Sequence, residues 1–105
     1  MKKIECIVRS KKLPELEDAL KLLGIRGMTV SEVKGFGNQQ TRPDAYLFLP
    51  KTKIEIYSID EEVESIVQAI SIVCKSGQPG DGKIAIFDVH DLVRIRTGDR
   101  GEVAV

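Results

Sequence analysis

Hydrophobic and polar residues alternate along four stretches of this chain and recur at helical spacing along two others. The alternating stretches are residues 3–8, 28–34, 46–57 and 84–89, and the helical stretches follow Pro14 and Ser58. A period of two is typical of strands that bury one face, and apolar residues three and four positions apart are typical of amphipathic helices. The pattern therefore predicts the element order βαββαβ.

Start and stop signals frame the two helical stretches. Pro14 suits the first turn of a helix, and Gly24 ends the run. Ser58 and Glu61 match the S-x-x-E capping box, which predicts the start of the second helix. The apolar stripe of that helix consists of Val63, Ile66, Val67, Ile70 and Val73. A stripe of this kind packs against a hydrophobic core.

The order βαββαβ is that of the split βαβ, ferredoxin-like arrangement, which is an α+β fold. It predicts an antiparallel sheet with two helices on one face. The 105 residues suffice for one hydrophobic core, so residues 1–105 are predicted to form a single domain. Alternation leaves Ile7 and Val30 for the other face of the sheet, which favours oligomerisation through that face. Pro50 is expected to mark a bulge or an edge in its strand.

Composition narrows the classes of partner. The chain has sixteen basic and sixteen acidic residues, so no net charge attracts it to nucleic acid. No apolar run approaches the roughly 20 residues of a membrane span, so direct membrane insertion is not expected. The first twelve residues, MKKIECIVRSKK, interrupt their short apolar run with charge, unlike a signal peptide. A cytoplasmic protein is expected.

The cysteines and the histidine do not form a recognisable reactive group. Cys6 and Cys74 lie far apart in apolar segments and have no second sulfur or histidine at ligand spacing. They are predicted to be small core residues, and a disulfide or a metal pair is the less favoured alternative. His90 is the only histidine, which excludes a metal site built on several histidines.

Two glycine-bearing segments are candidates for ligand binding. In GFGNQQ, Gly35 and Gly37 permit close backbone approach or unusual dihedral angles, although this segment taken alone is typical of a plain loop. In SGQPGDGK, residues 76–83, successive glycines can form an anion-binding nest and Lys83 can contact a phosphate oxygen. Ile84 follows that lysine where a Walker A loop has Ser or Thr. On its own the segment is more typical of a turn than of a ligand-binding loop.

A basic segment, RIRTGDRG, follows the last predicted strand. Arg94 and Arg96 are two apart, so in a strand both would project from one face and could engage neighbouring oxygens of a polyphosphate. The alternative is a solvated strand edge. Because only a short strand and a corner separate these arginines from Lys83, the two basic segments together indicate a nucleotide site.

No acid–base pair accompanies this site. Four aspartates, Asp44, Asp81, Asp88 and Asp91, are scattered along the chain, and no serine lies in a nucleophile elbow. A binding protein is therefore favoured over an enzyme. Two alternatives stay open: a small phosphate-handling hydrolase that uses the same loops, and a structural trimer of this fold that binds a divalent metal or only a protein.

Five segments in the same order resemble the PII signal-transduction proteins. They are MKKIECIVRSKKL, GMTVSEVKGFGNQ, LPKTKIEI, GDGKIAIFDV and VRIRTGDRGE, and they cover nearly the whole chain. The resemblance implies a ferredoxin-like homotrimer that binds ATP or ADP in three clefts between subunits. It also implies regulation of other proteins according to nucleotide and, commonly, 2-oxoglutarate, through an exposed T-loop.

The resemblance implies roles for individual residues. The phosphate-holding B-loop would comprise Gly80, Asp81, Gly82 and Lys83, with Ser76 where the family often has threonine. Arg94 and Arg96 match the C-terminal loop arginines, which reach the phosphates from a neighbouring subunit.

The same resemblance extends to the base and the effector. Thr29 and the backbone near Tyr57 would lie by the base, and Lys51 would help to hold the effector carboxylates. The phosphate side at the root of the T-loop would be lined by Gly35, Gly37 and Gln39. Of these, Gln39 is also a candidate Mg²⁺ contact.

The chain departs from the family in the T-loop. The segment NQQTRPDAYLFL is several residues shorter than the family's loop, and counting back from Pro50 places Tyr46 at the base, so modification of this tyrosine is not implied. The short loop resembles the divergent PII-like branch, whose members sense adenine nucleotides together with metabolites such as bicarbonate. We therefore expect ATP, ADP or AMP as ligands, with 2-oxoglutarate or bicarbonate as a second effector. Residues 37–46 would signal nitrogen or carbon status to an unidentified partner, either a membrane transporter or a metabolic enzyme.

Overall fold

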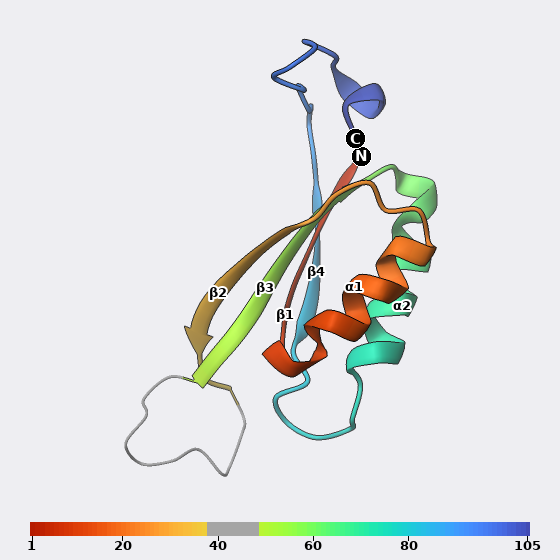
Figure 1. The fold of residues 1–105 in the computed structure, drawn as a ribbon. Coiled ribbons are helices and arrows are strands. Elements are labelled where there is room, and N and C mark those ends of the chain that lie inside the picture. Colours follow the sequence, from red (N-terminus) through yellow and green to blue (C-terminus); the bar gives the residue numbers. More distant parts are fainter. Residues whose placement is uncertain (38–48) are drawn as a thin grey trace.

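The computed structural model describes residues 1–37 and 49–105, which form four strands and two α-helices (Figure 1). In chain order they are β1 (Lys2–Val8), α1 (Leu13–Leu22), β2 (Thr29–Gly35), β3 (Leu49–Ser58), α2 (Val63–Cys74) and β4 (Lys83–Asp88). Short 3₁₀ turns occupy Ser10–Lys12, Asp60–Glu62 and Gly101–Ala104. The predicted α+β order βαββαβ is confirmed.

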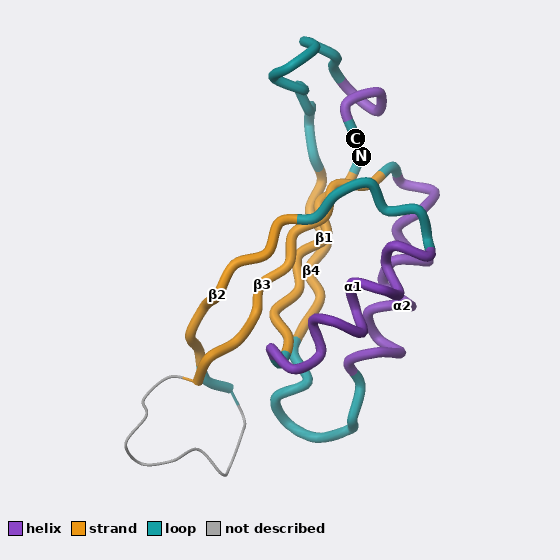
Figure 2. Tube along the Cα trace, in the orientation of Figure 1, coloured by secondary structure: helices purple, strands orange, loops and turns teal. Residues whose placement is uncertain are grey.

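The strands form one antiparallel sheet in the order β2-β3-β1-β4. This order is that of the ferredoxin-like fold. Both helices lie on the same face of the sheet, as Figure 2 shows, and no helix of the described residues lies on the opposite face. We call that opposite face the open face.

The hydrophobic core lies between the sheet and the helices. Ile4 is paired with Ile56 across the β1–β3 ladder, and both side chains are buried. The helices contribute the buried residues Leu16, Leu20, Val63, Ile66, Ile70, Val73 and Cys74. Cys6 and Cys74 are free thiols in this core, as predicted. Burial raises the pKa of the Cys6 thiol to about 12, which keeps it protonated and unreactive near neutral pH.

Strand register corrects one prediction about the two faces. Val30 is paired with Ile54, whose side chain is fully buried under the helices, so Val30 lies on the helix-covered face and its assignment to the open face was wrong. Opposite partners in an antiparallel ladder share a face. Val30 is nevertheless 39% exposed because β2 is an edge strand. Ile7, paired with Lys53, does lie on the open face.

The predicted capping box does not form. Ser58 is the buried last residue of β3, and its hydroxyl donates to the Ile59 carbonyl oxygen at 2.8 Å. A 3₁₀ turn over Asp60–Glu62 then leads into α2, which begins at Val63. The strand holds Ser58 too far from the helix for capping. Pro14, by contrast, lies in the first turn of α1 as predicted.

Pro50 lies at a local edge and not at a bulge. It pairs with Lys34 in an uninterrupted β2–β3 ladder, whereas the β1–β3 ladder ends at Thr52. The missing proline N–H therefore costs no hydrogen bond to β1. The first part of the predicted strand, residues 46–48, lies outside the described residues.

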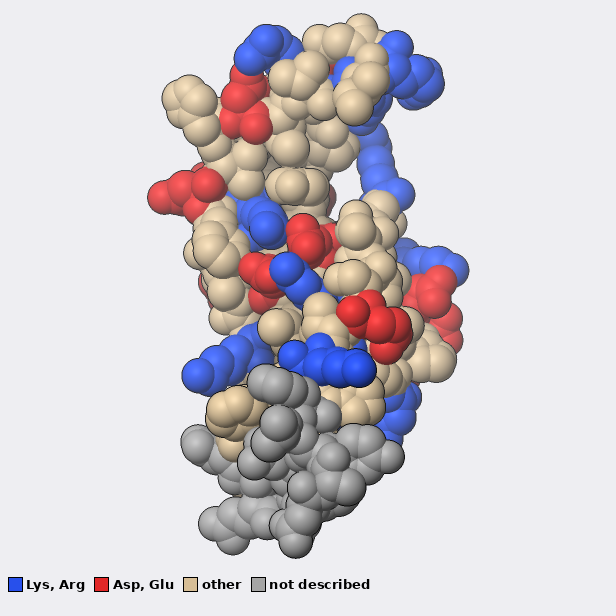
Figure 3. Space-filling view, turned by 90° about the vertical axis from the view of Figure 1, so that its left-hand side faces the viewer, with Lys and Arg blue, Asp and Glu red and all other residues tan. Residues whose placement is uncertain are grey.

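Charged side chains of both signs cover the open face. Lys53 Nζ lies 2.8 Å from Glu5 and 3.5 Å from Glu55, and Lys3 Nζ lies 3.5 Å from Glu55. Figure 3 shows acidic and basic residues interspersed on this side of the molecule. Among the described residues, no helix is long and apolar enough to span a membrane.

Candidate functional site

The predicted binding residues fall into two groups at opposite ends of the sheet (Figure 1). The first group lies where β2 ends and β4 begins and comprises Gly35, Gly37, Lys51, Ser76, Gly80, Asp81, Gly82 and Lys83. The second group lies where β2 begins and the chain continues beyond β4, and comprises Thr29, Tyr57, Arg94 and Arg96. Gln39, and with it the predicted Mg²⁺ contact, lies outside the described residues.

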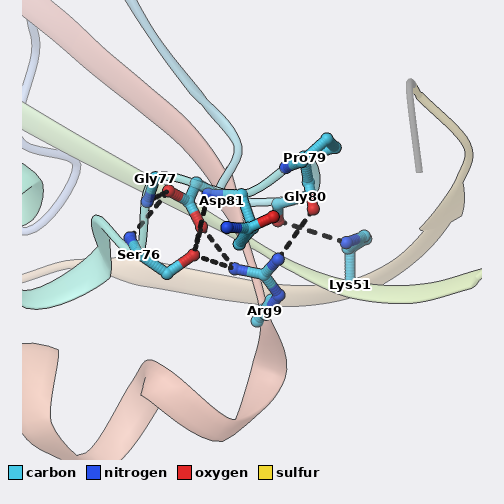
Figure 4. A network of polar contacts seen from close by, with 8 residues as sticks. Arg9, Lys51, Ser76, Gly77, Pro79, Gly80 and Asp81 are labelled. Carbon is cyan, nitrogen blue, oxygen red and sulfur yellow. Dashed lines mark hydrogen bonds and ion pairs between the residues drawn. The ribbon is translucent and has the colours of Figure 1, made fainter. Parts of the chain in front are cut away.

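Residues 76–82, which we call the glycine loop, fold around the carboxylate of Asp81 (Figure 4). One carboxylate oxygen accepts the backbone N–H groups of Ser76 at 2.7 Å and Gly77 at 2.9 Å. The other accepts the Ser76 hydroxyl and the guanidinium of Arg9. These donors stabilise the ionised form, led by the Ser76 contacts, and hold the pKa of Asp81 well below its ordinary range.

Two cations support the glycine loop from the sheet. Arg9, the residue after β1, donates to the Pro79 carbonyl oxygen at 2.8 Å as well as to Asp81. Lys51 on β3 donates to the Gly80 carbonyl oxygen at 3.4 Å. Lys51 is only 9% exposed, and burial, followed by the charge of Arg9, lowers the pKa of its ammonium group. Within residues 1–37 and 49–105 this weak contact is the one hydrogen bond of the Lys51 ammonium group, and a buried cation with so little compensation is suited to an anionic ligand.

Gly82 is required by the close approach of the loop to β1. Its φ is +102°, and a Cβ at this position would lie 1.9 Å from the Ile7 carbonyl oxygen. Lys83 follows as the first residue of β4, and its side chain is exposed. Gly35 and Gly37 have neither positive φ nor crowding, so their backbone geometry alone does not require glycine.

A pocket of about 610 Å³ lies at the other end of the sheet. Three residues of the second group, Thr29, Tyr57 and Arg94, line it, and Arg96 is not among the lining residues. Arg94 is held in place by Asp99, 3.3 Å from its guanidinium, and by the Val103 carbonyl oxygen at 3.2 Å.

Arg94 and Arg96 do not lie in a strand, which corrects the prediction for VRIR. Val93 forms an isolated bridge with Arg100, and residues 95–97 form a turn. The turn forms because the Gly98 N–H donates to the Arg94 carbonyl oxygen at 2.7 Å, and φ of +76° suits glycine there. The two arginines therefore do not share the face of a strand.

Sequence reasoning missed several residues of both groups. Arg9 carries no motif that distinguishes it from other basic residues, and only the fold brings it to the loop. Glu55 lines the pocket and is paired with Thr29 across the β2–β3 ladder, so a correct register would have found it. Arg26 and Glu62 line the same pocket from loop and turn positions.

The two groups do not meet within one chain. The six residues of β4 separate them, which corresponds to about 17 Å of extended strand. Lys83 therefore cannot share one phosphate with Arg94 or Arg96 of the same chain. The two basic segments are close in sequence, but the residues between them form the extended strand β4, so the segments lie at its opposite ends.

Comparison with known proteins matches the chain over nearly its whole length. The family model described as nitrogen regulatory protein P-II matches residues 1–99. This chain belongs to the P-II family. Its homologues are named as regulators and not as enzymes, so P-II membership places the chain among signal-transduction regulators.

P-II proteins of distant organisms are similar to this chain. Nitrogen regulatory protein P-II of Pasteurella multocida is 44% identical over 112 aligned positions that cover 100% of both chains. Nitrogen regulatory protein P-II 1 of Methanothermobacter thermautotrophicus is 46% identical, covering 100% of this chain and 97% of its own length. Nitrogen regulatory protein P-II 1 of Escherichia coli K12 is 45% identical with both chains fully covered. An alignment of 112 positions exceeds the 105 residues of this P-II chain, so the chain leaves positions of its relatives unfilled.

Proposed function

We propose that this chain is a P-II regulator that forms a homotrimer, binds ATP, ADP or AMP in the clefts between subunits, and reports nitrogen or carbon status to a partner protein in the cytoplasm. The observation that carries the proposal is the separation of the two basic groups by β4. Each group is half of a phosphate site, and a second copy of the chain supplies the missing half.

The side chains available for phosphate support this arrangement. Lys83 and Arg96 are exposed, and no ion pair or side-chain hydrogen bond joins either of them to another residue within the described ranges. Arg94 is paired with Asp99 and lines the pocket at the end of the sheet opposite Lys83. If Lys83 of one copy lay beside Arg96 of the next, both cations could bind one polyphosphate. The negative charge of the polyphosphate would offset the repulsion between the two cations.

The pocket wall favours adenine. Thr29 and Glu55 lie opposite one another on β2 and β3 at the pocket, with Tyr57 two residues along β3. A carboxylate accepts a hydrogen bond from an exocyclic amino group and repels a carbonyl oxygen. Adenine carries an amino group where guanine carries a carbonyl, so ATP, ADP or AMP should bind more tightly than GTP.

Lys51 supports a second, acidic effector. Its buried ammonium group faces the glycine loop, where a carboxylate of 2-oxoglutarate or a bicarbonate ion would replace the weak contact with the Gly80 carbonyl oxygen. The partner protein, and the role of residues 37–46 in reporting the bound state, belong to the same proposal.

The test measures nucleotide binding by calorimetry and then by subunit mixing. Wild-type protein should bind an adenine nucleotide, and Lys83→Ala or Arg96→Ala should each weaken binding roughly tenfold or more, because each loses a charged hydrogen bond worth about 1.5–3 kcal/mol. The two variants are then unfolded together, refolded as a mixture and titrated again. A cleft is intact when its Lys83 comes from an Arg96→Ala subunit and its Arg96 comes from a Lys83→Ala subunit. With equal amounts of the two variants, about a quarter of all clefts should therefore regain wild-type affinity.

Lys11→Ala removes an exposed charge outside both groups and serves as the control. Absence of recovery on mixing would show that the two groups do not act across subunits. No binding of ATP, ADP or AMP to the wild type at millimolar concentration would overturn the nucleotide function itself.

A further inference from the structure

Arg9 contacts the glycine loop at three separate points (Figure 4). Its guanidinium lies 2.5 Å from an Asp81 carboxylate oxygen, 2.8 Å from the Pro79 carbonyl oxygen and 3.5 Å from the Ser76 hydroxyl. The Arg9 side chain is 23% exposed, and that of Asp81 is 21% exposed. A planar guanidinium can contact several acceptors at once, whereas the single ammonium group of lysine presents one point charge.

Asp81, one of the predicted ligand-binding residues, is fully engaged by its own loop and by Arg9. Its two oxygens accept two backbone N–H groups, one hydroxyl and the guanidinium of Arg9. The amides of Ser76 and Gly77 are therefore bound to Asp81 and not presented to an external anion. A carboxylate in this position would repel a phosphate, and Arg9 offsets that charge.

The end of β1 also fixes the other side of the loop. Gly82 approaches the Ile7 carbonyl oxygen so closely that no side chain fits, and Arg9 lies only two residues beyond Ile7. Lys83 follows Gly82 directly and begins β4 in register with Ile7. The segment from Ile7 to Arg9 thus contacts the end of the loop at Gly82 and pairs with Lys83, while Arg9 holds Pro79 and Asp81.

We propose that Arg9 is the positioning residue of the glycine loop. It turns the Pro79 carbonyl and the Asp81 carboxylate toward the sheet, and so holds Lys83 and the amides beyond Pro79 in the conformation that binds a phosphate, without touching the ligand itself. This inference rests on the proposed nucleotide function for its binding consequence, but its structural consequence is present in the free protein.

The structural consequence is tested by amide NMR on the free protein. Arg9→Met should shift the backbone amide resonances of Ser76 and Gly77, because their acceptor loses its anchor. Arg9→Lys should give intermediate shifts. Lys11→Met, which removes a nearby exposed charge, should leave both resonances in place. Unchanged Ser76 and Gly77 resonances in a folded Arg9→Met protein would overturn the proposal, whether or not nucleotide binds.

The binding consequence is tested by a double-mutant cycle on ATP affinity with Arg9→Met, Asp81→Asn and the double variant. If Arg9 is a positioning residue, Arg9→Met should lower ATP affinity roughly tenfold or more, and Arg9→Lys should restore part of it. The double variant should bind ATP no more weakly than Arg9→Met alone. Additive losses would show that Arg9 contacts the nucleotide directly and would overturn the proposal. If wild-type protein binds no nucleotide, the proposed function fails, and the amide resonances alone decide the role of Arg9.

Discussion

At the scale of single residues, Asp81, Gly82 and Lys83 are consecutive in the sequence, but each has a different structural setting in or beside the glycine loop. Asp81 accepts hydrogen bonds from its own loop, and Gly82 provides the space that the β1 backbone needs. Lys83, next along the chain, points to solvent and is available for a ligand. These three consecutive residues therefore have different structural settings: Asp81 organises the loop, Gly82 allows its close approach to β1, and the side chain of Lys83 is exposed.

Gly82→Ala is expected to destabilise the protein by roughly 2 kcal/mol or more, because the new Cβ meets the Ile7 carbonyl oxygen in addition to the strain of positive φ. Gly77 also has positive φ, but a Cβ there would meet open space, so Gly77→Ala should cost only about 1 kcal/mol. Urea denaturation of both variants measures the difference. Equal losses would show that the contact with Ile7 does not contribute.

At the scale of elements, burial in the central strand β1 matches the alternation of apolar and polar residues more closely than burial in the edge strand β2 does. In β1, Ile4, Cys6 and Val8 are buried while Ile7 is exposed, as alternation predicts. The edge strand β2 is exposed or half-buried along its whole length, so its alternation does not identify which face it buries. The amphipathic stripe of α2 was predicted correctly because it contains every buried residue of that helix except its last, Cys74.

Ile66→Ala in α2 is expected to lower the free energy of unfolding by about 2–5 kcal/mol, because Ile66 is 1% exposed in the core and its truncation leaves a cavity. Ile72 lies in the same helix but is 75% exposed, so Ile72→Ala should change stability by no more than about 0.5 kcal/mol. Chemical denaturation at a fixed protein concentration compares the two. A large loss for Ile72→Ala would indicate that this surface is buried in an assembly.

At the scale of the whole molecule, the two described helices cover only one face of the sheet. Ile7, Tyr57 and Phe87 are each exposed by between 41% and 46% on this open face, beside the interspersed lysines and glutamates. The two halves of the proposed phosphate site lie at opposite ends of the same sheet. An assembly that brings copies together through the open face would cover the apolar residues.

Sedimentation analysis is expected to give a particle of about three times the 11.6 kDa chain mass. Ile7→Asp should reduce the mass toward that of one chain, because a carboxylate on the open face would be desolvated on assembly. Leu22→Asp changes a residue that is 89% exposed on α1 and should leave the mass unchanged. A monomeric wild type would contradict both the trimer and the shared cleft.

Local patterns identified SGQPGDGK as a glycine-bearing turn, and residues 76–82 do form a loop between α2 and β4. Thr29 and Tyr57 were assigned only by the family resemblance, and both line the pocket at the other end of the sheet. Their role in ligand binding stays a prediction. The expectation of a strand over VRIR was wrong. The backbone of Arg94 is hydrogen-bonded to Gly98 and Asp99, which forms a turn, and Val93 makes only an isolated bridge with Arg100. The capping box at Ser58 was wrong because a strand continues to that residue.

The amino-acid sequence was sufficient for the order βαββαβ and for the residues of the glycine loop, because both follow from spacing between neighbours along the chain. It could not place Val30, which depends on the register of β2 against β3, or Arg9, whose partner Asp81 lies 72 residues away. Only the folded sheet separates Lys83 from Arg94 by the length of β4, and under the proposed function a second copy of the chain is needed to bring the two side chains together. Local preferences act over a few residues, whereas register and packing join residues that are distant in the sequence.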